Sequence, residues 1–109
     1  MRFLDAPGPE FRPGAGEGQS DSAELADYLR AGHVLFASMG GVEDVLGSGE
    51  FVLGGGSLLT DGEWVWRGVL WFYVERYRFP LPEAFVAQVR AAGYRVPAVD
   101  AERLRVLAG

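Results

Sequence analysis

The side chains that could do chemistry in this sequence are few, and they begin with a single histidine, His33. The chain contains no cysteine and no second histidine, which excludes a thiol nucleophile, a cysteine-ligated zinc and a metal site with two histidines. His33 directly follows Gly32, where a helix is predicted to end, and a histidine there commonly satisfies the last free carbonyls. We therefore predict that His33 is structural and that the chain has no catalytic residue, cofactor or metal site.

Two pairs of acidic residues, Glu43 with Asp44 and Asp61 with Glu63, are the other candidates for chemistry. A general acid needs a partly desolvated carboxyl group with a raised pKa. Asp61 and Glu63 instead flank a predicted turn that water reaches, so we predict that all four acids contact a partner. The alternative is a small ligand-binding or enzymatic domain that uses His33 with Glu43 or Asp44 in a glycine-lined cleft.

Charge is distributed unevenly along the chain, whose net charge is −5. Residues 1–63 hold eleven acidic residues against three arginines, a net −8, whereas residues 64–109 carry a net +3. An acidic total argues against nucleic-acid binding by phosphate neutralisation and permits a basic protein partner. The glycine clusters at 47–49 and 54–56 lack the Gly-Lys-Ser/Thr ending of a phosphate-binding loop, and there is no lysine at all, so we predict no nucleotide site.

Membrane insertion is not expected, because the longest apolar run, residues 69–74, is far shorter than the roughly 20 residues that cross a bilayer. The first residues also lack the apolar stretch of a signal peptide. We expect a soluble cytoplasmic protein. The absence of lysine, isoleucine and asparagine beside abundant alanine, glycine and arginine indicates a bacterial genome of high GC content.

Two segments of different composition divide the chain. Residues 1–20 are rich in proline and glycine, which predicts a flexible N-terminal tail unless Phe3, Leu4 or Phe11 ties it down. Residues 21–109 are predicted to form a single α+β domain. Its first helix is expected from Ser22 to Ala31, with Asp21 and Glu24 at the spacing of a capping box.

The middle of this domain is predicted to be a short antiparallel meander of three to four strands. Residues 33–38 are apolar on both sides, which favours a strand covered on both faces. Asp61-Gly62 favours a two-residue hairpin loop within residues 57–66 that pairs Thr60 with Glu63. The hairpin then carries its apolar side chains on two faces, with Leu58 and Val65 on one and Leu59, Trp64 and Trp66 on the other.

Two to three C-terminal helices are expected to pack on this meander. Helical periodicity covers residues 68–79 and 83–92, and Asp100 is placed to cap a last helix. The two hairpin tryptophans are predicted to be core residues. Trp71 instead falls on a flank of its helix beside Glu75 and Arg78, and because tryptophan and arginine are enriched at interface hot spots, we predict that Trp71 contacts a partner.

Residues 58–97 carry three linked motifs: DG.W.W from Asp61, L..YV..Y from Leu70 and LP..F from Leu81. This pattern resembles one found in small uncharacterised bacterial proteins, which imply no activity. Small, acidic, cysteine-free proteins of this type also resemble immunity proteins of polymorphic toxin systems.

We therefore predict a non-catalytic protein-binding domain, in the manner of an immunity protein whose acidic side covers a basic toxin domain. A second alternative is a structural module that forms a homodimer through its aromatic face. The predicted contact residues are Glu43, Asp44, Asp61, Glu63 and Trp71.

Overall fold

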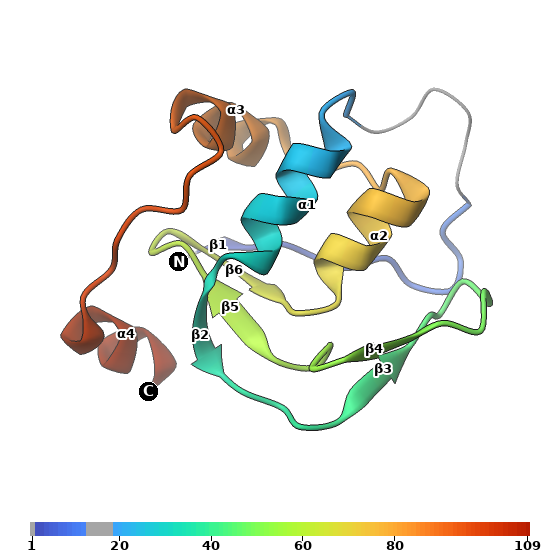
Figure 1. The fold of residues 1–109 in the computed structure, drawn as a ribbon, viewed down its shortest axis with the longest axis horizontal. Helices are drawn as coiled ribbons and strands as arrows, with labels where there is room; N and C mark the ends of the chain where they lie inside the picture. Colours follow the sequence, from blue (N-terminus) through green and yellow to red (C-terminus); the bar gives the residue numbers. More distant parts are fainter. Residues whose placement is uncertain (1, 13–18) are drawn as a thin grey trace.

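The computed structural model describes residues 2–12 and 19–109 and confirms an α+β fold (Figure 1). In this part of the chain, four strands form one mixed sheet, two form a separate antiparallel ribbon, and four helices follow or separate them. The elements are β1 (Arg2–Phe3), α1 (Ser22–Arg30), β2 (His33–Phe36), β3 (Gly41–Glu43), β4 (Phe51–Leu53), β5 (Leu58–Thr60), β6 (Trp64–Arg67), α2 (Leu70–Tyr77), α3 (Glu83–Ala91) and α4 (Ala101–Ala108). No helix among these residues is long and apolar enough to cross a membrane.

The four-stranded sheet has the order β1-β6-β5-β2, and its first pair is parallel, so it is not a simple antiparallel meander. The parallel strand β1 comes from the segment that the sequence predicts to be a flexible tail. Leu4 is buried and its amide donates to the carbonyl oxygen of Val65 over 2.8 Å, while Phe11 packs edge-on against Phe79. Part of the predicted tail is therefore tied to the domain by these apolar side chains; residues 1 and 13–18 lie outside the described residues.

The β5–β6 hairpin has a four-residue loop, not the predicted two-residue one, because Thr60 pairs with Val65. Hydrogen bonds from side chains hold this longer loop in place of the backbone hydrogen bonds that would close a two-residue turn. The Asp61 carboxylate accepts the amides of Glu63 and Trp64, and the Thr60 hydroxyl donates to the Trp64 carbonyl oxygen over 2.6 Å. The shift moves each pairing by two positions along β6, so every side chain keeps its predicted face.

The core lies between this sheet and α1, α2 and α3, which lie together on one side of it in Figure 1. Trp64 and Trp66 are both buried here, which confirms the prediction that they are core residues. The Trp66 ring nitrogen donates to the carbonyl oxygen of Leu29 over 3.0 Å, and Phe85 packs edge-on against both indoles. The indole N–H of a buried tryptophan needs such a partner, so this bond fixes how α1 sits on β6.

The N-terminus of α1 does not use the predicted capping box, because the Asp21 side chain makes no cap hydrogen bond. It binds instead to the guanidinium of Arg90, at 2.8 and 2.9 Å, and to the hydroxyl of Tyr94 at 2.7 Å. The hydrogen bond from Arg90 holds the pKa of Asp21 well below its usual range. Asp21 therefore joins the start of α1 to the end of α3.

The sequence predicts that strand β2 is covered on both faces, but the structure leaves it partly exposed. Val34 and Phe36 are exposed, because β2 is the last strand of the sheet and the connection to β3 carries the chain away from the helices. Its neighbour β5 lies in the interior of the sheet. This edge position leaves Val34 and Phe36 at the surface, although α4 lies against part of β2.

The connection from β6 to α2 runs against the connection from β4 to β5, and glycines allow their close approach. The amide of Gly68 donates to the carbonyl oxygen of Ser57 over 2.7 Å, and the amide of Val69 donates to that of Gly55 over 3.0 Å. A Cβ atom at Gly68 would lie 2.6 Å from the carbonyl oxygen of Gly54, closer than real contacts allow. The start of α2 is thus held directly against the connection from β4 to β5.

We predict that Gly68→Ala lowers the free energy of unfolding by about 1–3 kcal/mol, because the added methyl group must push backbone away from backbone. Urea denaturation measures this change. Gly40→Ala is the matched control, since the nearest atom to its Cβ would be 4.0 Å away; its effect should stay within about 0.5 kcal/mol. Equal stability of the two variants would contradict this account of the connections.

Candidate protein-binding surface

The predicted contact residue Asp44 is only 3% exposed, so its side chain lies inside the domain and not at its surface. Its carboxylate accepts the amides of Leu46 at 2.8 Å and Ser48 at 3.2 Å, and the hydroxyl of Tyr77. Burial alone would raise the pKa of Asp44, but the hydrogen bonds from Ser48, Tyr77 and Leu46 outweigh it and lower that pKa. Asp44 is therefore an ionised anchor that fixes the tip of the β3–β4 ribbon to α2.

Asp61, another predicted contact residue, is 2% exposed and is also structural. Besides the two loop amides, its carboxylate accepts the hydroxyl of Tyr28 at 2.6 Å and the side-chain amide of Gln88 at 3.2 Å. Gln88 in turn accepts the ring nitrogen of Trp64 at 3.0 Å. Short carboxylates that follow a strand can fold back onto loop amides, and this is why the sequence does not separate these two acids from exposed ones.

Glu43 and Glu63, the two remaining acids of the predicted set, are both exposed. They lie on different parts of the molecule, Glu43 on the ribbon and Glu63 at the hairpin tip. The five predicted contact residues therefore do not form one surface.

His33 does not meet the carboxylates with which the sequence could pair it. Its Nε2 atom lies 2.8 Å from the carbonyl oxygen of Pro97, in the connection before α4. The Asp44 carboxylate is occupied instead by the amides of Leu46 and Ser48 and by the hydroxyl of Tyr77. Within the described residues, no three His, Asp or Glu side chains are grouped so as to hold a metal ion.

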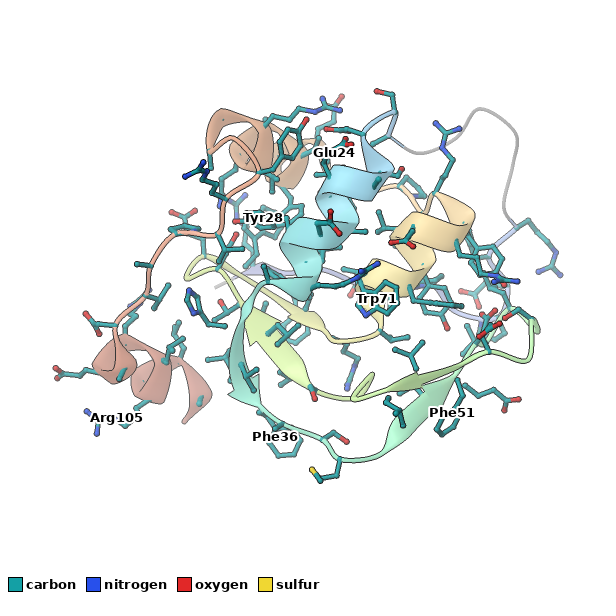
Figure 2. All side chains as sticks on the ribbon, viewed as in Figure 1. Glu24, Tyr28, Phe36, Phe51, Trp71 and Arg105 are labelled. Carbon is teal, nitrogen blue, oxygen red and sulfur yellow. The ribbon has the colours of Figure 1, made fainter. Side chains whose placement is uncertain are left out.

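Trp71 is half-buried on α2, and a guanidinium covers its exposed ring. The Arg30 guanidinium carbon lies 4.0 Å from the Trp71 ring centroid, a stacking distance for a cation on an aromatic face. Arg30 also forms an ion pair with Glu75 and lies 3.9 Å from Asp27. Trp71 and Arg30 together form a stacked pair between the end of α1 and the start of α2, with Trp71 labelled in Figure 2.

A groove of about 210 Å³ opens beside this pair, where the four-stranded sheet meets the ribbon. Its walls expose polar and apolar surface in nearly equal shares, and they include Val34, 55% exposed, and Leu53, 79% exposed. We call it the Trp71 groove; its lining residues are Arg30, Val34, Ala37, Leu53, Gly54, Ser57, Leu59, Gly68 and Trp71.

The outer face of the ribbon extends the apolar surface beyond the groove. Phe51 and Leu53 alternate with buried Val52 along β4, so both point outward. The Phe51 ring packs over Gly41, where an added Cβ atom would lie 2.1 Å from the nearest ring carbon. Figure 2 shows Phe51 pointing away from the helices. Glu43, paired with Phe51 across the ribbon, and Glu50, next to it in the chain, place exposed negative charge beside this ring.

The contact of Trp71 with a partner stays a prediction, and the sequence did not predict that Val34, Phe51 and Leu53 are exposed. A period-2 pattern marks these side chains as apolar without showing which face of a three-residue strand is covered. That information depends on where the ribbon leaves the main sheet, which is a tertiary property.

Comparison of the chain with family models, curated proteins and solved structures found no match. The resemblance carried by the motifs of residues 58–97 therefore stays a prediction.

We predict that Asp44→Asn lowers the free energy of unfolding at pH 7 by about 1–3 kcal/mol, because three donors lose a charged acceptor. These hydrogen bonds hold the folded-state pKa of Asp44 below that of an ordinary aspartate. The ionised carboxylate therefore stabilises the fold above about pH 4, and this contribution is lost as the pH falls further.

Urea titrations between about pH 7 and pH 2.5 should thus show the stability gap between the wild type and Asp44→Asn narrowing below about pH 4. Glu43→Gln removes a neighbouring carboxylate that makes no hydrogen bond or ion pair with the described residues, and it serves as the control. A gap that stays constant with pH would contradict the assignment of Asp44 as an ionised anchor.

Proposed function

We propose that this chain is a non-catalytic protein-binding domain that holds its partner at the Trp71 groove and the outer face of the ribbon. The observation that carries the proposal is the stacked Trp71–Arg30 pair at the wall of a groove that also exposes the aliphatic side chains of Val34 and Leu53. Tryptophan and arginine are enriched at interface hot spots, and here they lie together beside exposed aliphatic side chains. Large exposed apolar side chains grouped in this way mark interaction sites.

Charge favours a basic partner. Glu43 and Glu50 flank Phe51 and form no ion pair with any described residue, while Asp27 and Glu75 lie exposed around Arg30. Residues 1–63, which contain the ribbon and one wall of the groove, carry a net charge of −8. Negative charge around an apolar centre is complementary to a protein with a basic rim, and it accelerates their association. This is the chemistry expected of an immunity protein that covers a basic toxin domain.

A partner can be obtained by capturing host proteins on the immobilised wild-type chain, and the surface can then be tested with that purified protein. We predict that Trp71→Ala and Leu53→Asp each weaken its binding by about tenfold or more, because both remove apolar contact at the centre of the interface. Surface plasmon resonance measures the affinities. Val106→Asp, on exposed α4, is the matched control and should bind like the wild type.

We further predict that the association rate with this partner falls steeply as salt concentration rises, because exposed charges steer the encounter. A rate that does not depend on salt would contradict the basic partner, and normal binding by both groove variants would contradict the site. Sedimentation of the chain alone distinguishes the homodimer alternative: a dimer that Leu53→Asp dissociates would assign the groove to a second copy.

A further inference from the structure

The β3–β4 ribbon has two strands, so each strand has one edge that no other strand of the described chain covers. In Figure 1, β3 lies on the side of the ribbon that faces away from α2. The edge strand of the main sheet, β2, differs from it because α4 lies against part of β2. We call the outward side of residues 40–44 the β3 edge.

The hydrogen bonds of the ribbon show which backbone groups point out of this edge. The amide of Gly54 donates to the carbonyl oxygen of Gly40 over 2.8 Å, and the amide of Asp44 donates to that of Glu50 over 3.0 Å. In an antiparallel pair, every second residue of a strand bonds to the partner strand, and the residues between them point the other way. Residues 40, 42 and 44 therefore bond within the ribbon.

Gly41 and Glu43 lie between these residues, so their backbone N–H and C=O groups point out of the β3 edge. Within residues 2–12 and 19–109, no hydrogen bond reaches any of these four groups. Natural edge strands are commonly protected by lysine, proline or a bulge, whereas β3 has a regular register and Glu43 as its one charge. The two donors and two acceptors are thus arranged as an added antiparallel strand requires.

Side chains on the outer face of the ribbon indicate what such a strand would carry. Phe51, 61% exposed, packs its ring over Gly41, so the ring covers part of β3. An apolar side chain on the added strand, opposite Gly41, would contact this ring, because the glycine has no side chain in between. The residue opposite Val42, which is partly buried on the other face of the ribbon, would also be apolar.

Charge decides the residue opposite Glu43. Both Glu43 and Glu50 are exposed, and neither forms an ion pair with a described residue. A cross-strand position opposite a carboxylate favours arginine or lysine and disfavours another acid. A second copy of this chain, with its net charge of −5, would bring the same acidic residues together, so a basic segment fits this edge better.

We propose that the basic partner adds one of its own extended segments to the β3 edge as an antiparallel strand, an inference that rests on the proposed function. The segment carries a basic residue opposite Glu43, followed by two apolar residues opposite Val42 and Gly41. Backbone hydrogen bonds to Gly41 and Glu43 hold it, and the side chains select it.

The edge can be tested without the partner, by using a blocked peptide Ser-Thr-Arg-Val-Leu-Thr-Ser as the probe in a nuclear magnetic resonance titration of the full chain. We expect the amide proton signals of Gly41 and Glu43 to move downfield, because both amides gain an acceptor. The amides of Val42 and Asp44 already bond within the ribbon and should move less. The absence of a shift at Gly41 and Glu43 at millimolar peptide would overturn the proposal.

Two N-methylated forms of the peptide are matched controls, because they keep every side chain and the charge. Methyl groups on the arginine and leucine amides block the two groups that face β3, and should weaken binding by about tenfold or more. A methyl group on the valine amide points away from β3 and should leave the affinity unchanged. Equal affinities of the two forms would contradict strand addition and indicate attraction by charge alone.

The same distinction can be made on the chain itself. Glu43→Pro removes an outward N–H that the ribbon does not use, and should weaken peptide binding by about tenfold or more. Glu43→Gln keeps this N–H and loses only the charge, so about threefold weakening is expected. Equal effects of the two variants would overturn the proposal. If Glu43→Pro does not fold, the N-methylated peptides decide the question on the wild-type chain.

Trp71→Ala separates this proposal from the proposed function. The variant should bind the peptide like the wild type, because the peptide occupies the β3 edge and not the Trp71 groove. Normal peptide binding together with normal partner binding by the groove variants would overturn the groove alone. Loss of the β3 signals with the groove effects intact would overturn strand addition alone. A dimer of the free chain that Glu43→Pro dissociates would assign the edge to a second copy and overturn it too.

Discussion

The buried carboxylate of Asp61 is the interaction on which the rest of this structure depends. A desolvated carboxylate is costly unless donors surround it, and here four donors converge from the hairpin loop, from Tyr28 on α1 and from Gln88 on α3. Burial, and then the bond to Asp61, raises the pKa of Tyr28, so the hydroxyl stays a donor. One charge thereby sets the position of two helices on the sheet, and with them the packing of Trp64 and Trp66.

The surfaces follow from that arrangement. Helices α1, α2 and α3 cover the face of the sheet that bears Trp64 and Trp66. Glycine-lined connections then carry the chain away from the sheet and place Trp71 and Arg30 beside the ribbon. The apolar side chains that no helix reaches gather at this junction. The opposite face is left to a single short helix, α4, so the two sides of the sheet differ sharply in how firmly they are covered.

The sequence predicted what local chemistry decides. The helix positions were predicted correctly from their apolar periodicity. The two faces of the hairpin and the burial of Trp64 and Trp66 were also predicted correctly, because a register shift of two residues leaves each side chain on the same face. It did not predict the parallel strand β1, whose pairing spans some sixty residues, or the burial of Asp44 and Asp61. Whether a carboxylate is a surface charge or an anchor depends on partners such as Tyr28 and Tyr77, which lie far away in the chain.

Amide hydrogen exchange of the full chain, free and bound to its partner, tests whether a partner protein occupies the Trp71 groove. We expect protection on binding to concentrate in residues 34–37, 51–57 and 68–75, which contain most of the groove lining and strand β4. Protection confined to α3 and the hairpin loop, with the groove segments exchanging as in the free chain, would contradict it.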